Sequence, residues 1–101
     1  MSWYEVLPVS ALNDKEMKVI EVSGKRISVG KVGSDFFAFD DTCTHYQCSL
    51  SQGFIEGTTV ECPCHGALFD IKSGNVLRLP ATVAINTYPV KVENGIVFVE
   101  V

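Results

Sequence analysis

Four residues of the types that bind soft metal ions stand in two closely spaced pairs. Cys43 and His45 flank one residue, and Cys62 and His65 flank two, which gives the pattern C-x-H-x16-C-x-x-H. A lone cysteine is usually a small buried hydrophobic residue, and a lone histidine is more often hydrogen-bonded than bound to a metal. Two cysteine–histidine pairs in glycine-containing segments depart from that expectation. The spacing therefore predicts that all four residues bind one inorganic centre.

Zinc is the first metal that such a set could hold, because two cysteines and two histidines form an ordinary structural zinc site. Zinc motifs, however, usually pair like ligands, as C-x2–4-C and H-x3–5-H. Here each segment contributes one thiolate and one imidazole. A zinc-stabilised binding module therefore stays open as the weaker alternative.

The mixed pairs resemble the signature of the Rieske iron–sulfur family, a C-x-H segment followed by a C-x-x-H segment. The similarity extends over "CTHYQCSLSQGFIEGTTVECPCHGALFDIKSGNVLRLPA", in which Leu79-Pro80-Ala81 resembles a proline loop that shields the cluster in that family. The resemblance implies one Rieske-type 2Fe–2S cluster per chain, with Cys43 and Cys62 on one iron and His45 and His65 on the other. Outside this segment the chain is similar only as a generic β scaffold.

The ligand set that the resemblance implies has a consequence for redox chemistry. Two thiolates neutralise the oxidised cluster, so an added electron creates a single negative charge instead of adding to several. Neutral imidazoles therefore raise the reduction potential above that of plant-type ferredoxins, into a range of about −150 to +300 mV.

Two further positions indicate where in that range the protein falls. Respiratory Rieske proteins carry a serine two residues and a tyrosine four residues after the second ligand histidine, and both hydroxyls donate at the cluster. Here those positions are Ala67 and Phe69, which have no side-chain donor. The resemblance therefore implies the lower part of the range, as in ferredoxins that supply electrons to oxygenases.

The other two cysteines, Cys48 and Cys64, lie one in each segment. They occupy the positions of an inter-loop disulfide in the respiratory proteins, whereas many oxygenase ferredoxins have no such pair. The resemblance implies a Cys48–Cys64 disulfide, and two buried thiols are the alternative.

Composition and length set the limits within which these residues act. The chain has 101 residues, 47% of them hydrophobic and 20% charged, which suits one small folded domain. Its net charge of −4 argues against a nucleic-acid partner, because phosphate binding requires a basic face. We find no signal peptide in "MSWYEVLPVSALND" and no apolar run of roughly 20 residues. A cytoplasmic protein with no membrane partner is therefore expected, as a monomer or weak oligomer.

The elements that must position the ligands read as all-β. Residues rich in valine, isoleucine and aromatic side chains predict strands, and Asn94-Gly95 predicts a type I′ hairpin turn. The expected strands cover 17–22, 27–29, 35–41, 58–62, 67–71, 88–92 and 96–99. We expect an antiparallel β sandwich or barrel in which residues 1–40 and 76–101 form a base domain. Residues 41–75, rich in glycine, would form an inserted cluster-binding subdomain.

The remaining polar residues do not indicate catalysis. Asp40 and Asp41 are expected to be solvated turn acids, and no nucleophile with a positioned base is evident. The resemblance to Rieske proteins implies an electron carrier between a ferredoxin reductase and a terminal oxygenase or similar enzyme. A small Rieske-type subunit of a larger reductase, as in nitrite reductases, is the alternative.

Overall fold

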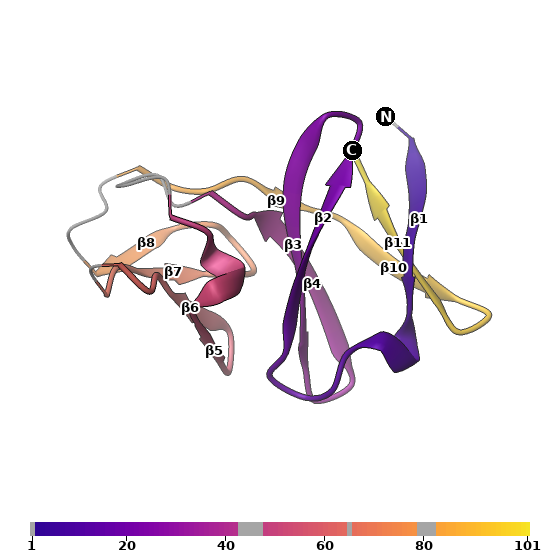
Figure 1. Cartoon of the computed structure of the whole chain (residues 1–101), viewed down its shortest axis with the longest axis horizontal. Helices are drawn as coiled ribbons and strands as arrows, with labels where there is room; N and C mark the ends of the chain where they lie inside the picture. The colour runs from indigo at the N-terminus through magenta and orange to yellow at the C-terminus, as the bar shows by residue number, and fades with distance from the viewer. Residues whose placement is uncertain (1, 43–47, 65, 79–82) are drawn as a thin grey trace.

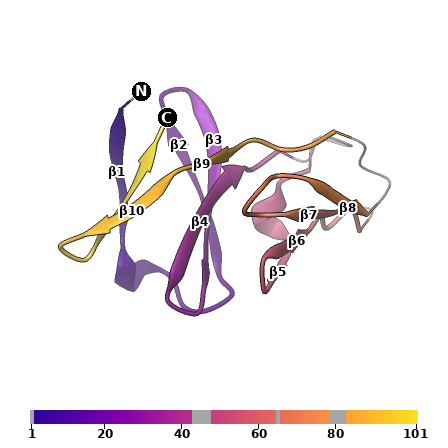
Figure 2. The same cartoon turned by 180° about the vertical axis from the view of Figure 1, so that it is seen from behind.

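The computed structural model describes residues 2–42, 48–64, 66–78 and 83–101. Within these residues the chain forms three antiparallel sheets joined by turns and two short 3-10 helices, η1 (Val9–Ala11) and η2 (Leu50–Gln52). Two of the sheets lie together at one end of the molecule, and the third lies at the other end (Figures 1 and 2). In the described part of the chain, no helix has the length and apolarity needed to cross a membrane. The all-β expectation is confirmed.

The first sheet joins the two ends of the chain. It consists of β1 (Trp3–Pro8), β11 (Ile96–Glu100) and β10 (Val90–Glu93), in that order. Ser2 and Val101 exchange backbone hydrogen bonds of 3.2 and 3.0 Å, which places the termini side by side (Figure 1).

The hairpin between β10 and β11 has the turn that its sequence predicts. Asn94 and Gly95 have φ values of +53° and +74°, and a type I′ turn requires positive φ at both positions. The turn places Glu93 opposite Ile96 and so sets the register of the two strands.

The second sheet is built from β2 (Met17–Val22), β3 (Lys25–Val32), β4 (Asp35–Asp40) and the short β9 (Thr87–Tyr88). Its strands pack against the first sheet around one buried apolar core. That core contains Leu7, Leu12, Val22, Ile27, Val29, Ala38, Val97 and Val99.

The third sheet contains β5 (Phe54–Glu56), β6 (Thr59–Glu61), β7 (Leu68–Asp70) and β8 (Val76–Arg78). Its strands are only three residues long, so the sheet depends on its own buried core. That core contains Phe39, Leu50, Ile55, Val60, Cys62, Ala67, Phe69, Ile71 and Ile85. The sheet runs to Arg78, three residues beyond the boundary at residue 75 that the sequence suggested; the division into subdomains remains an interpretation.

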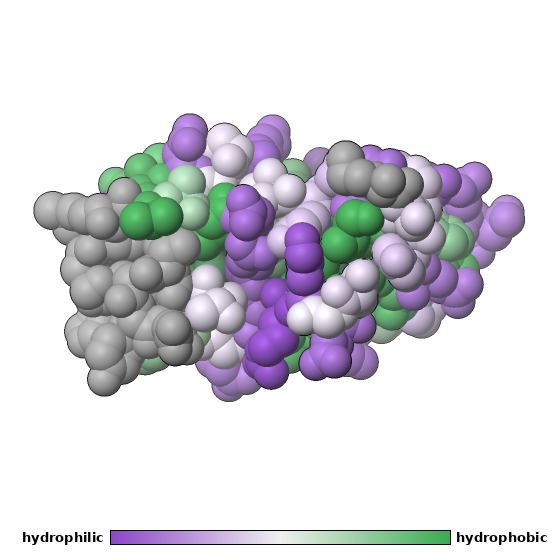
Figure 3. Space-filling view, turned by 90° about the horizontal axis from the view of Figure 1, so that it is seen from above, coloured by the Kyte–Doolittle hydropathy of each residue, from purple (hydrophilic) through white to green (hydrophobic). Residues whose placement is uncertain are grey.

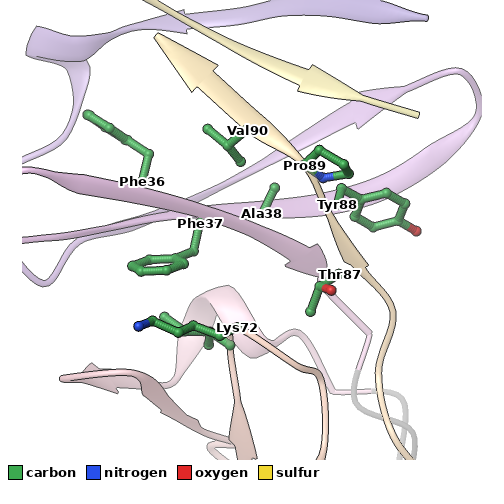
Figure 4. Close-up of a pocket in the computed structure, with 9 residues that line it drawn as sticks. Phe36, Phe37, Ala38, Lys72, Thr87, Tyr88, Pro89 and Val90 are labelled. Carbon is green, nitrogen blue, oxygen red and sulfur yellow. The ribbon is translucent and has the colours of Figure 1, made fainter. Parts of the chain in front are cut away.

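Strand β4 connects the two cores because its side chains alternate. Phe36 packs against the core of the first two sheets, whereas Phe37 packs against the core of the third. Figure 4 shows the two rings on opposite sides of the strand. The small sheet is therefore packed against the strand that leads into the first cysteine–histidine pair.

The turn between β7 and β8 holds the segment that returns to the base sheets. Gly74 has a φ of +82°, and its carbonyl accepts a 2.9 Å hydrogen bond from the amide of Ile85. A Cβ at Gly74 would lie 2.0 Å from the carbonyl oxygen of Ile85, so only glycine allows this approach.

Gly74→Ala is therefore expected to destabilise the protein by at least about 2 kcal/mol, because backbone strain and a steric clash coincide. Gly24→Ala is the matched control. Gly24 has a similar φ of +78° with nothing within 4 Å of the added Cβ, so a loss of about 1 kcal/mol is expected. Denaturant unfolding of both variants measures the difference, and equal losses would contradict the proposed clash.

Candidate metal centre

Cys62 is the one expected ligand that falls within the described residues; Cys43, His45 and His65 lie outside them. Cys62 directly follows β6 and is 1% exposed, within the apolar core of the small sheet. A soft thiolate ligand in such a place is shielded from water, which suits a metal–sulfur bond. The complete ligand set remains a prediction.

Backbone hydrogen bonds fix the two ends of the segment between β6 and β7. The amide of Cys62 donates to the carbonyl of Ala67 at 2.8 Å, and the amide of Gly66 donates to the carbonyl of Cys62 at 3.1 Å. Gly66 has a φ of +74°, which explains the glycine in "CPCHG". Arg78 on β8 adds a 3.3 Å hydrogen bond from Nη1 to the carbonyl of Gly66.

A disulfide joins the two cysteine-containing segments. Cys48 and Cys64 are bonded, with a Cα–Cα distance of 6.4 Å, so the expected cross-link is confirmed. The sulfurs of Cys48, Cys62 and Cys64 all lie within 4.8 Å of one another. The two bonded sulfurs are not thiolates, so Cys62 is the member of this trio suited to bind iron.

Backbone pairing also closes the first segment. Thr42 and Ser49 form an isolated antiparallel bridge, and the amide of Leu50 donates to the carbonyl of Asp41 at 2.6 Å. Residues 43–47 therefore lie between two positions that are paired with each other.

The side chain of Asp41 strengthens this closure, and the expectation that it is a solvated turn acid is wrong. Asp41 is fully buried and accepts hydrogen bonds from the hydroxyl of Ser49, the amide of Ser51 at 2.9 Å and Nη2 of Arg26 at 3.3 Å. Burial raises the pKa of the carboxyl, but these hydrogen bonds outweigh it and leave the pKa below its ordinary value. The donors come from distant positions, so the local sequence did not reveal them.

Asp40 is not a free turn acid either. It accepts a 2.6 Å hydrogen bond from the hydroxyl of Tyr88 and one of 3.1 Å from the amide of Asn86, whose carbonyl accepts from the Asp40 amide. Burial and the neighbouring carboxylate raise the pKa of Tyr88, so the phenol stays protonated and donates. Asp40 thus ties the chain leaving the small sheet to the strand that enters it.

The two positions expected to lack hydroxyl donors lie in the same core as Cys62. Ala67 and Phe69 are both fully buried, and the carbonyl of Ala67 accepts the Cys62 amide. Their apolar side chains fit a cluster held by few side-chain hydrogen bonds. The site is consistent with an iron–sulfur cluster. It has a buried thiol, a disulfide between the two segments and apolar surroundings that exclude water.

A groove beside β4 and β10 offers no alternative reaction centre. It has a volume of 480 Å³ and lies where β10 diverges from β4, lined largely by aromatic and aliphatic side chains (Figure 4). Its titratable lining residues are Lys72 and Tyr88, and Tyr88 already donates to Asp40. The lining has no paired acid and base that could convert a substrate.

Two large hydrophobic side chains are exposed close to residues 79–82 in the sequence. Leu77 and Val83, which flank residues 79–82 in sequence, are 52% and 60% exposed. Figure 3 shows separate patches of hydrophobic surface among hydrophilic ones on this face of the molecule.

Replacing both Cys48 and Cys64 by Ser should accelerate cluster loss on heating. A disulfide that closes a loop of this length stabilises the folded state by about 3 kcal/mol, and the variant loses that contribution. The disulfide itself is checked by alkylating denatured protein before and after reduction. The unreduced sample should show two fewer reactive thiols than the reduced control. Equal thiol numbers, or unchanged thermal release of the cluster, would contradict the stabilising role.

Comparison with known proteins agrees with this description. The model of the Rieske [2Fe-2S] domain matches residues 2–89. The ferredoxin component of the naphthalene 1,2-dioxygenase system of Pseudomonas putida is 36% identical over 94 residues, covering 93% of this chain and 90% of the relative. The 3-phenylpropionate/cinnamic acid dioxygenase ferredoxin subunit of Escherichia coli K12 is 43% identical over 94 residues, covering 92% and 88%.

A solved structure gives the same result in three dimensions. A chain from the complex of reduced oxygenase and oxidised ferredoxin in carbazole 1,9a-dioxygenase superimposes with a TM-score of 0.90 and 35% identity, over 96% of this chain and 91% of that one. The chain therefore belongs to the Rieske [2Fe–2S] domain family, and its cofactor is a 2Fe–2S cluster.

Proposed function

We propose that this protein is a one-electron carrier that passes electrons from a ferredoxin reductase to a terminal oxygenase or a similar redox enzyme. The observation that carries the proposal is the buried Cys62 beside the Cys48–Cys64 disulfide, in a chain similar to ferredoxin components of dioxygenase systems. A cytoplasmic location is part of the proposal.

Cys43, His45, Cys62 and His65 are the proposed cluster ligands. A bound Rieske cluster supplies reversible one-electron chemistry at a potential raised by its neutral imidazole ligands. The chain's own residues hold the ligand-bearing segments together through the disulfide and exclude water around Cys62 with Ala67 and Phe69.

The partners follow from the relatives. Their names describe ferredoxin components that work within dioxygenase systems, and one similar chain was solved in complex with an oxygenase. The exposed Leu77 and Val83 would lie at such a contact. The family match disfavours the zinc-stabilised module, and the ferredoxin names favour a separate carrier over a fixed subunit of a larger reductase.

The visible spectrum of the purified protein tests the cluster first. A red-brown protein with two irons and two acid-labile sulfides per chain is expected. Reduction by a dioxygenase-system reductase and reoxidation by its terminal oxygenase, followed at the cluster's absorbance, then test the carrier role. A colourless protein containing zinc would overturn the proposal.

His65→Cys is expected to lower the reduction potential, because a neutral ligand is replaced by a charged thiolate that disfavours the added electron. His45→Cys should act in the same direction. Ser73→Cys, which adds an exposed cysteine in the β7–β8 turn, is the control and should leave the potential unchanged. Protein-film voltammetry measures all three; unshifted potentials in the histidine variants would remove the two histidines from the ligand set.

Phe69→Tyr and Ala67→Ser are expected to raise the potential. Each new hydroxyl would donate a hydrogen bond to a sulfur at the cluster and so stabilise its more negative reduced state. A hydrogen bond to a charged acceptor contributes about 1.5–3 kcal/mol, and part of this stabilisation is also present in the oxidised state. Shifts of some tens of millivolts to about 100 mV per substitution follow, since 59 mV corresponds to a tenfold change for one electron. Voltammetry of both variants provides the check. A wild type near the top of the Rieske range would contradict the low-potential assignment.

A further inference from the structure

We infer that Asp41 is a positioning residue for the cluster: its buried carboxylate holds together the described residues on either side of the first proposed ligand-bearing segment and places a negative charge beside them. The inference rests on the ligand set proposed above. It goes beyond that set because Asp41 is not a proposed ligand and acts through Ser49, Ser51 and Arg26.

The closure depends on the carboxylate because each of its oxygens holds a different partner. Oδ1 accepts the amide of Ser51, and Oδ2 accepts the hydroxyl of Ser49 and Nη2 of Arg26. Ser49 and Ser51 are also within hydrogen-bonding distance of each other, with 2.8 Å between their hydroxyl oxygens. The buried side chain of Asp41 thus holds Ser49 and Ser51, which follow Cys48, close to its own position two residues before Cys43.

The main chain alone makes a weaker closure. It contributes the Thr42–Ser49 bridge and the bond from the Leu50 amide to the Asp41 carbonyl, both adjacent to the carboxylate network. A buried carboxylate that lost its donors would be strongly disfavoured, so the network resists separation of Asp41 from Ser49 and Ser51. The described residues that precede Cys43 and follow Cys48 are therefore held together.

The charge has a separate effect on the electron. The Asp41 side chain is 1% exposed, whereas its partner Arg26 is 58% exposed and largely screened by water. A buried anion next to the ligand-bearing segment opposes the added negative charge more than the solvated cation favours it. Asp41 thus shifts the reduction potential downward, in the same direction as the absent hydroxyls at positions 67 and 69.

Reduction potentials and thermal cluster release of three variants test the inference at a fixed neutral pH. Asp41→Asn should make reduction three- to tenfold more favourable, a rise of about 30–60 mV, and should speed cluster release severalfold. Arg26→Gln leaves the carboxylate in place and should shift the potential in the opposite direction. Ser49→Ala should speed release without raising the potential, because it removes a donor and no charge.

Asp70→Asn is the matched control. Asp70 also accepts backbone amides in a turn, from Lys72 at 2.8 Å and Ser73 at 3.3 Å, but that turn joins β7 to β8 and bears no proposed ligand. Its replacement should leave the potential unchanged.

Asp41→Asn with a wild-type potential and release rate, or with the same shifts as Asp70→Asn, would overturn the inference. If Asp41→Asn does not fold, the Arg26→Gln and Ser49→Ala variants test the inference. A wild-type potential and release rate in both of them would overturn it as well. A wild-type protein that binds no cluster would instead contradict the proposed function, and this inference with it.

Discussion

Two segments that lie far apart in the chain must be held against each other, and the Cys48–Cys64 disulfide meets this requirement. It spans 16 residues of sequence and joins the stretch after β4 to the stretch between β6 and β7. The strands between them are three residues long and would be marginal alone. The cross-link therefore restrains the small sheet. It also keeps the sulfur of Cys62 near those of Cys48 and Cys64. The buried apolar residues around Cys62 complete a dry site suited to a metal–sulfur bond.

Two adjacent carboxylates anchor this unit on the base sheets. Asp40 accepts hydrogen bonds from Asn86 and Tyr88 on the returning chain, while Asp41 accepts one from Ser51, which follows the first cysteine–histidine segment. Neighbouring residues can do both tasks because successive side chains at the end of a strand point in opposite directions. The small sheet is thus fixed where the chain enters it and where the chain leaves it.

Much of this could be predicted from local patterns. The Asn94-Gly95 turn formed as expected because its positive φ values depend on the two residues themselves. Strand β2 formed at 17–22, where β-branched residues favour it. The roles of Asp40 and Asp41 could not be predicted, because their donors lie 8 to 48 residues away. Nor does the sequence indicate that β8 belongs to the small sheet, since strand pairing depends on where the chain turns back.

The chemistry proposed for the centre can be inferred from the sequence by itself. The proposed ligands, two cysteines and two histidines, rest on residue type, spacing and the resemblance to the Rieske signature, and Ala67 and Phe69 carry no hydroxyl that could donate to the cluster. Tertiary structure alone decided that Cys48 and Cys64 come within bonding distance, that Ile85 packs against Gly74 and that Asp41 is buried. The physical reason is that each of these depends on contacts between segments distant in the chain, which only the packed sheets bring together.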